Sequence, residues 1–243
     1  MRFLSKLWKK EGLADLSKLK VDVHSHLIPG IDDGAATLDH SIGMIMAFAD
    51  LGYQRLVTTP HVMLEGYVNT PEIILSGLGK VRQAIQELKI PIEIDAAAEY
   101  YFDAGLIEKI ENKKLLTFGG NHVLFEFSFH QEPHFIDELI FAFKTHGYLP
   151  VLAHFERYGY YNSLEKAKEL REKGVKIQLN LNSLSGHYGP QVQKQAEQMV
   201  KQKIVDLAGS DCHRIEHLQI LKKNLSKPMY HQLLDLDLLN YQL

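Results

Sequence analysis

Seven short apolar runs, rich in β-branched residues, alternate with longer stretches of helical periodicity along most of this chain. We expect buried strands at Val21–Val23, Arg55–Thr58, Ile92–Ala97, Val123–Phe127, Leu149–Ala153, Val175–Leu181 and Ile204–Ala208. Helical patterns cover Asp39–Leu51, Pro71–Leu88, Ala104–Glu111, His134–Thr145, Ser163–Lys173 and Pro190–Gln202. Strands that alternate with helices pair in parallel, so the pattern predicts a parallel sheet that is closed or nearly closed.

Side chains that could hold a metal ion lie in or directly after six of the seven runs. They are His24, His26, His61, Glu99, Glu126, His154, Asp211 and His213, and Asp33 follows in a Gly-bounded turn after the first run. In a β/α barrel the C-terminal ends of the strands converge on one face, where active sites are built. A doubly wound open sheet is the alternative, but no G-x-G-x-x-G follows the first run. We therefore predict an α/β fold, a barrel of about seven strands.

The H-x-H pair is the centre of this candidate site. Residues two apart in an extended chain point to the same side, so His24 and His26 can reach one point. Nine candidate ligands exceed the needs of one ion, and two or three ions bridged by a carboxylate would use them all. Mixed imidazole and carboxylate donors suit manganese, iron or zinc.

Composition excludes several other classes of protein. The formal net charge of -3 gives no electrostatic reason to expect nucleic acid as a partner. The single cysteine, Cys212, excludes an internal disulfide framework and suits a reducing cytoplasm. No stretch approaches the ~20 apolar residues of a membrane span, and the N-terminus lacks the pattern of a signal peptide. We expect an N-terminal extension over residues 1–20 and a single domain over residues 21–243.

Six motifs in a fixed order carry a resemblance to a known family. The motifs H-S-H-L-I-P-G-I-D-D-G, T-T-P-H, A-E-Y-Y, L-F-E-F-S, A-H-F-E-R-Y and S-D-C-H resemble the PHP (polymerase and histidinol phosphatase) superfamily. The resemblance spans Val21 to His213 and is strongest to the bacterial manganese-dependent protein tyrosine phosphatases of capsule and exopolysaccharide gene clusters. It implies a distorted TIM-like (β/α)7 barrel, the PHP fold, with a three-metal Mn²⁺ site.

The resemblance also implies a role for each site residue. One metal would take His24, His26, Glu99 and Asp211, a second Glu99, Glu126 and His154, and a third Asp33, His61 and His213. Arg157 would bind the substrate phosphate, and Asp33 or His213 would orient the attacking water or protonate the leaving oxygen. Relatives carry a further phosphate-binding arginine several residues after the D-x-H. In this chain Leu218 stands in that region, and Arg214, directly after His213, is the candidate instead.

The implied activity is hydrolysis of phosphate monoesters, with the phosphorylated tyrosine-rich tail of a bacterial tyrosine kinase as the implied protein substrate. An apolar rim for the phenyl ring is expected from Met63, Leu64, Tyr67, Phe129 and His130.

A histidinol phosphatase would use the same metals and is the main alternative. A nuclease would require a basic track, which the charge balance disfavours. A non-enzymatic module would be expected to lose ligands. A cysteine phosphatase would need an arginine six residues after Cys212, where Leu218 stands.

Overall fold

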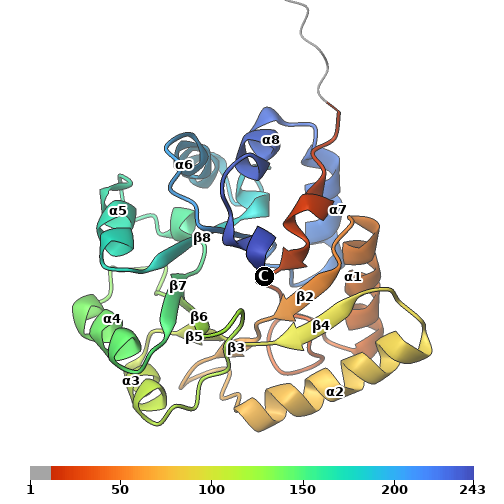
Figure 1. Ribbon diagram of the computed structural model, residues 1–243, viewed down its shortest axis with the longest axis horizontal. Helices are drawn as coiled ribbons and strands as arrows, with labels where there is room; N and C mark the ends of the chain where they lie inside the picture. The colour runs from red at the N-terminus through yellow and green to blue at the C-terminus, as the bar shows by residue number, and fades with distance from the viewer. Residues whose placement is uncertain (1–11) are drawn as a thin grey trace, which may run out of the picture.

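The structure is a computed structural model that describes residues 12–243, in which parallel strands form a curled sheet with helices around its outside (Figure 1). Three strands pair in the order β1 (Val21–Asp22), β2 (Arg55–Thr58) and β4 (Glu93–Ala96). Six more pair in the order β3 (His61–Val62), β5 (Glu99–Tyr101), β6 (His122–Glu126), β7 (Leu149–Leu152), β8 (Lys176–Asn180) and β9 (Leu207–Gly209). Each of the seven predicted runs contains or overlaps an observed strand.

Two of the predicted strands are interrupted. β3 follows β2 after two residues, and β5 follows β4 after two residues, so each pair forms the two halves of one broken strand. Parallel bonding continues past the breaks, because Ala97 N donates to Thr58 O (2.9 Å) and Glu99 N donates to Pro60 O (3.1 Å). Pro60 has no N–H of its own and cannot extend the ladder, which is one reason for the first break. The sequence pattern did not predict β3 and β5 as separate elements.

The ring is closed between the first and last strands. Ser25 and Cys212 form a parallel bridge, Asp211 N donates to His24 O (2.8 Å), and His26 N donates to Cys212 O (2.9 Å). The predicted barrel of about seven strand positions is thereby confirmed as a distorted barrel. The same bonds bring the H-x-H segment against the D-C-H segment, which lies almost 190 residues later in the chain.

Helices cover the outside of the barrel. Those that correspond to predicted helices are α1 (Leu38–Asp50), α2 (Pro71–Glu87), α3 (Ala104–Glu111), α4 (Ile136–Thr145), α5 (Glu165–Glu172) and α6 (Pro190–Lys201). Two more, α7 (Ile215–Asn224) and α8 (Pro228–Leu234), were not predicted. The described residues also contain four short 3-10 turns: η1 (Leu16–Leu19), η2 (Phe155–Arg157), η3 (Leu181–Ser183) and η4 (Leu239–Gln242). None of the helices in the described residues is both long and apolar enough to cross a membrane.

Local sequence explains where several helices begin. Thr70 is the N-cap of α2 and accepts a hydrogen bond from Ile73 N, and Pro71 occupies the first turn. The helix predicted from His134 begins two residues later, at Ile136, because Phe135 takes a left-handed backbone conformation (φ 63°, ψ 31°).

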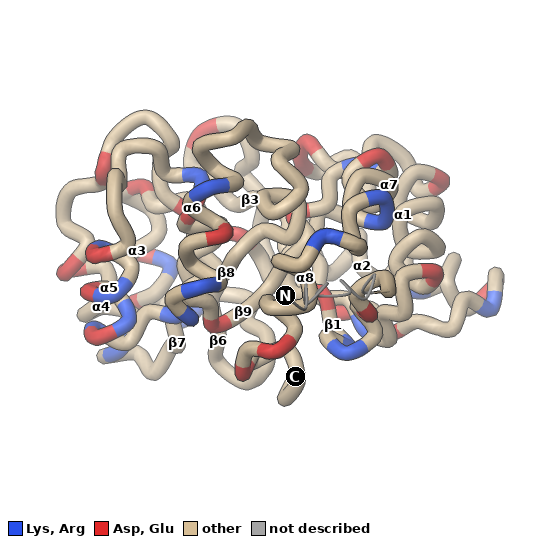
Figure 2. Tube along the Cα trace, turned by 90° about the horizontal axis from the view of Figure 1, so that it is seen from above, with Lys and Arg blue, Asp and Glu red and all other residues tan. Residues whose placement is uncertain are grey.

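The two ends of the barrel differ in chemistry. At the N-terminal ends of the strands, Leu239 and Leu243 pack on an apolar cluster that includes Val21, Val57 and Leu124, and the C-terminus lies over the centre of the ring (Figure 1). Residues 12–20 also pack here, since η1 buries Leu16 and Leu19 in the core. The polar residues of the candidate site are therefore gathered at the opposite end. Lys and Arg are interspersed with Asp and Glu along the described chain (Figure 2).

Candidate metal centre

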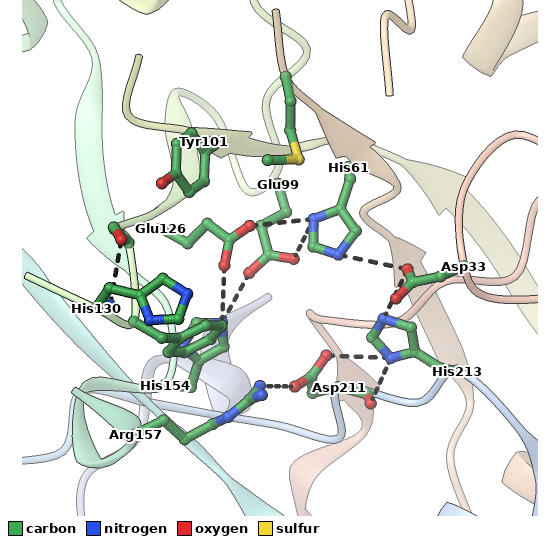
Figure 3. Close-up of a pocket in the computed structure, with 13 residues that line it drawn as sticks. Asp33, His61, Glu99, Tyr101, Glu126, His130, His154, Arg157, Asp211 and His213 are labelled. Atoms are coloured by element: carbon green, nitrogen blue, oxygen red, sulfur yellow. Dashed lines mark hydrogen bonds and ion pairs between the residues drawn. The ribbon is translucent and has the colours of Figure 1, made fainter. Parts of the chain in front are cut away.

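The structure brings all nine predicted ligand side chains together at the C-terminal ends of the strands. Figure 3 labels those that line the pocket: Asp33, His61, Glu99, Glu126, His154, Asp211 and His213. The nine side chains form four overlapping groups in which the possible ligand atoms lie within 4.8 Å of one another. The groups are His24, His26 and Glu99; His24, His154 and Asp211; His61, Glu99 and Glu126; and His26, Asp33, His61 and His213. Because every group shares a residue with another, the cluster is continuous.

Glu99 lies at the centre of this cluster and is fully buried. Its Oε2 lies 3.1 Å from His24 Nε2, 3.4 Å from His26 Nε2 and 3.2 Å from His61 Nδ1. Its Oε1 lies 3.0 Å from His154 Nε2. A carboxylate shared by four imidazoles matches the bridging role that the number of candidate ligands predicted.

The remaining carboxylates surround this centre. Asp211 Oδ1 lies 3.4 Å from both His24 Nε2 and His213 Nδ1. Asp33 Oδ1 lies 3.2 Å from His213 Nε2, and Glu126 Oε1 lies 3.3 Å from His61 Nδ1. Glu126 is thus a buried carboxylate with imidazole neighbours.

Backbone strain accompanies two of these side chains. His154 (φ 35°, ψ 51°) and Asp211 (φ 51°) both take left-handed conformations, which cost a non-glycine residue about 1–2 kcal/mol. His154 lies two residues after the end of β7, and Asp211 lies two residues after the end of β9. Such strain persists where the surrounding structure imposes it, and it is common at functional sites.

A second layer of hydrogen bonds orients the imidazoles. His26 Nδ1 donates to Asp32 Oδ2 (2.8 Å), and His24 Nδ1 donates to Gln178 Oε1 (2.9 Å). In a neutral imidazole, donation from Nδ1 leaves Nε2 without a proton, which is the form that binds a metal, and in both residues Nε2 is directed toward Glu99.

The D-D-G turn explains how Asp32 reaches His26. Gly34 N donates to Asp32 Oδ1 (3.0 Å), which fixes the aspartate in the turn. A Cβ atom on Gly34 would lie only 2.2 Å from His26 O, so only glycine allows the turn to approach the H-x-H segment this closely.

The sequence analysis missed Gln178, although a signal was present. Gln178 and Asn180 alternate with buried apolar residues in β8, so two polar side chains two apart share one face of a buried strand. Gln178 Nε2 donates to Asn180 Oδ1 (2.9 Å), and Asn180 Nδ2 donates to Asp211 Oδ2 (2.7 Å). β8 therefore supports the site through the side-chain amides of Gln178 and Asn180, while the segments after the neighbouring strands β7 and β9 contribute candidate ligands.

Buried polar atoms without partners show that the cluster fits a cation. Within residues 12–243, His24 Nε2, His26 Nε2, His61 Nδ1 and Glu99 Oε2 are buried and make no hydrogen bond. Leaving such atoms unsatisfied costs about 1–3 kcal/mol each, more if they are charged. Burial favours neutral His24, but the charges of Glu99 and Asp211 outweigh it and raise the His24 pKa to about 9. The carboxylates thus require positive charge among them, which divalent cations would supply.

Arg157 lies at the side of this cluster (Figure 3). It is in η2, three residues after His154, and its Nη1 donates to Asp211 Oδ2 (2.8 Å). Its guanidinium is held between the rings of Phe129 and Tyr188, at 4.5 Å from each centroid. Stacking on two rings is a geometry that arginine accepts and lysine does not. The sequence analysis did not identify Tyr188, which comes from the loop before α6.

Arg214 is placed differently from Arg157. It is the exposed N-cap residue of α7, and its Nε donates to His217 Nε2 (3.1 Å). It lines a separate hollow together with His213 and does not line the pocket above the cluster.

The pocket above the cluster has a volume of about 290 Å³. Of the five residues expected at an apolar rim, Met63, Phe129 and His130 line it, together with Tyr101 and Ser128, which were not expected. Tyr67 stacks on His61 (centroids 5.5 Å apart, planes at 13°), and Leu64 packs toward Gly105.

Cys212 is buried and does not line the pocket. Burial raises the pKa of its thiol well above the usual range, so it is not a thiolate nucleophile. Cys212 is instead a packing residue of the hydrophobic core.

Comparison with known proteins agrees with this geometry. YwqE of Bacillus subtilis (strain 168), named a tyrosine-protein phosphatase, is 26% identical over 223 residues, which cover 88% of this chain and 88% of YwqE. CpsB of Streptococcus pneumoniae, with the same activity in its name, is 28% identical over 220 residues, which cover 87% and 86%. A crystal structure from work on YwqE and CpsB, described as unique metal-dependent tyrosine phosphatases, has a TM-score of 0.78 at 25% identity and covers 91% of this chain and 94% of its own.

Residues 20–225 match the family model for capsular polysaccharide synthesis, CpsB/CapC. This range includes every one of the nine ligand candidates, Arg157 and Arg214. The chain belongs to the CpsB/CapC family of capsular polysaccharide synthesis.

Proposed function

We propose that this chain is a metal-dependent protein tyrosine phosphatase that hydrolyses phosphotyrosine in a bacterial capsule or exopolysaccharide system. The observation that carries the proposal is the continuous cluster of nine imidazole and carboxylate side chains with buried, unpartnered ligand atoms, beside a stacked arginine. The names of YwqE and CpsB support phosphotyrosine as the substrate and metal dependence as the chemistry.

The proposed metal sites keep the ligand sets that the family resemblance implies. One would use His24, His26, Glu99 and Asp211, a second Glu99, Glu126 and His154, and a third Asp33, His61 and His213. The side-chain groups support the first and third sets, and for the second set His154 Nε2 lies 3.0 Å from Glu99 Oε1 and 3.6 Å from Glu126 Oε2. Five imidazoles and four carboxylates suit manganese, iron or zinc, and the family resemblance favours three Mn²⁺ ions. Bound cations of this kind neutralise charge on phosphoryl oxygens and lower the pKa of water toward neutrality.

Arg157 is proposed to hold the phosphoryl group. One of its N–H groups is committed to Asp211, which leaves further donors of the planar fork for phosphoryl oxygens. The rings of Phe129 and Tyr188 restrict the guanidinium to one plane, so little freedom is lost on binding.

Asp33 and His213 are proposed to orient the attacking water and to protonate the leaving oxygen. The hydrogen bond with His213 lowers the pKa of Asp33 to about 2, so Asp33 is ionised at neutral pH. It can therefore accept a hydrogen bond from the attacking water but cannot act as the acid. His213 would use one ring nitrogen for the metal, so a proton for the leaving oxygen would have to come from its other ring N–H, and a phenolate needs that help least.

The substrate is proposed to be the phosphorylated tyrosine-rich tail of a bacterial tyrosine kinase. The phenyl ring would lie against Met63, Tyr101 and Phe129, which line the pocket above the cluster. Arg214 stays a prediction for substrate binding, and from its exposed place on α7 it would meet the protein substrate only outside the pocket. We further propose one catalytic domain over residues 21–243 and, given the free Cys212, a cytoplasmic location.

The test is an assay of the purified protein, chelated with EDTA and supplied with Mn²⁺, against p-nitrophenyl phosphate, phosphotyrosine peptides and histidinol phosphate. We expect phosphotyrosine peptides to have the highest kcat/KM, with no activity before Mn²⁺ is added. Glu99→Gln, which weakens the central carboxylate without changing its size, is the matched inactive control. A higher kcat/KM for histidinol phosphate than for every phosphotyrosine peptide would favour the alternative function.

A further inference from the structure

A second hollow, of about 470 Å³, lies beside the metal pocket and shares Tyr101 and Ser128 with it. Its walls come from the beginning of α3, with Ala104 and Ile107, and from the loop between β6 and α4, with Phe135. We refer to this hollow as the α3–α4 groove. A chain whose phosphotyrosine occupied the metal pocket would reach the groove directly, because Tyr101, which is labelled in Figure 3, and Ser128 line both.

Phe135 is the most unusual residue of the groove. Its side chain is 70% exposed, and its backbone is left-handed, with no side-chain hydrogen bond capping α4. The ring therefore gains little from burial, while the backbone carries a strain that glycine would relieve. Phe141, on α4, is 72% exposed but has regular helical geometry, which makes it an ordinary exposed side chain and a matched comparison.

The charge of the groove narrows what it can bind. Among the described residues that line it, the acidic side chains are Asp103 and Glu138, and none is Lys or Arg. Asp103 is partly committed, since it accepts hydrogen bonds from Leu64 N (2.8 Å) and Gly105 N (2.9 Å). This negative charge is unfavourable for an acidic side chain, and the apolar surface of Ala104, Ile107 and Phe135 suits an apolar one.

We propose that the α3–α4 groove binds an apolar side chain of the substrate protein within a few positions of the phosphotyrosine, with Phe135 as its principal contact. The proposal rests on the proposed function and adds a sequence preference to it. An extended peptide advances about 3.3 Å per residue, so a neighbour in the sequence can enter the groove while the phosphate remains at the metals. Apolar contact then selects among phosphotyrosine sites without taking part in the chemistry.

The experiment uses the Mn²⁺-loaded full-length protein and phosphotyrosine peptides of Ala and Ser in which one Leu, or one Glu, is moved through the positions flanking the phosphotyrosine. At one or two positions, Leu should raise kcat/KM about fivefold, mainly through KM, and Glu should lower it. Phe135→Ala should abolish the Leu effect and leave the rate with p-nitrophenyl phosphate unchanged. Phe141→Ala should retain both the Leu effect and the rate with p-nitrophenyl phosphate.

The outcomes separate the groove from the proposed function. If Leu has no effect on kcat/KM in the wild type, or if its effect survives Phe135→Ala, the proposal for the groove is wrong and the proposed phosphatase function is unaffected. Loss of p-nitrophenyl phosphate hydrolysis in Phe135→Ala also overturns it, because the ring would then support the metal pocket. Absence of activity on every phosphotyrosine substrate in wild type instead refutes the function on which the groove depends.

Phe135→Gly distinguishes binding from a role in folding. Glycine relieves the left-handed backbone, so the Tm should be at or above that of wild type although the Leu effect is lost. A fall in Tm of more than about 4 °C, roughly 1 kcal/mol or more for a chain of this size, would mean that the ring stabilises the fold and would overturn the proposal.

Discussion

Replacing Arg157 with Ala removes the side chain proposed to hold the phosphoryl group, while the metal ligands remain. Arg157 donates to Asp211 (2.8 Å) and lies between Phe129 and Tyr188, with a side chain that is 25% exposed. Its remaining donors therefore meet the phosphoryl oxygens in a partly desolvated pocket. Asp211 would keep its hydrogen bond from Asn180 (2.7 Å), so we expect the metal content of Arg157→Ala to be unchanged.

The expected loss follows from the strength of this contact. A charge-assisted hydrogen bond to charge that develops in the transition state is worth about 2–4 kcal/mol in such a site. Transition-state arithmetic converts this to a decrease of about 30- to 1000-fold in kcat/KM. Arg157→Lys should recover only part of the loss, because an ammonium group keeps the charge but neither stacks between the rings nor offers a planar fork.

The assay compares Arg157→Ala, Arg157→Lys and Arg214→Ala on a phosphotyrosine peptide, with metal analysis of the same samples. Arg214 is the matched control, because it also adjoins a ligand candidate but is exposed and outside the pocket. We expect Arg214→Ala to lose about tenfold or less, equivalent to ~1.4 kcal/mol. Near-wild-type activity in Arg157→Ala, together with a severe loss in Arg214→Ala, would refute the assignment of the phosphate-binding residue.

Three further predictions concern the metals and the thiol. Chelation should abolish activity, and Mn²⁺ should restore it better than Mg²⁺, because imidazole is a poor ligand for Mg²⁺; full activity in a sample shown by metal analysis to be metal-free would contradict this. Gln178→Ala removes the partner of His24 Nδ1 (2.9 Å) and should weaken metal affinity about 10- to 100-fold; an unchanged titration would mean that packing alone orients His24. Cys212→Ser should keep most of the activity, since the buried thiol lies outside the pocket, and loss of turnover with metals still bound would indicate thiolate chemistry.

The nine ligand candidates could be predicted because a parallel sheet has a simple geometric rule. Side chains that follow successive strands meet at one edge, whatever their separation in the chain. His24 and Asp211 are 187 positions apart, yet Nε2 and Oδ1 lie 3.4 Å from each other. Gln178 obeys the same rule, and the alternation in β8 would have revealed it had amides been considered beside charged groups.

The breaks that divide β2 from β3 and β4 from β5 could not be predicted from the hydrophobic pattern of the sequence. Pro60 lies at the break between β2 and β3, so that break has a signal in the sequence. The Ala-rich run between β4 and β5 contains no proline or glycine, so the second break has none. That second break follows the first, since the two strands are neighbours and must bend together to keep their bonds.

The sequence by itself determined the barrel and the set of side chains at its mouth, because hydrophobic periodicity and strand-end position are local properties of the chain. Only the tertiary structure showed which of the two arginines lies beside the cluster, since each of them stands within three residues of a ligand candidate. His154 takes a left-handed conformation and η2 turns Arg157 back over the cluster, whereas Arg214 has an extended backbone (φ -155°, ψ 158°) and the structure places it at an exposed site outside the pocket. The direction of a side chain after a strand depends on backbone angles that distant contacts impose, and residue types alone do not encode them.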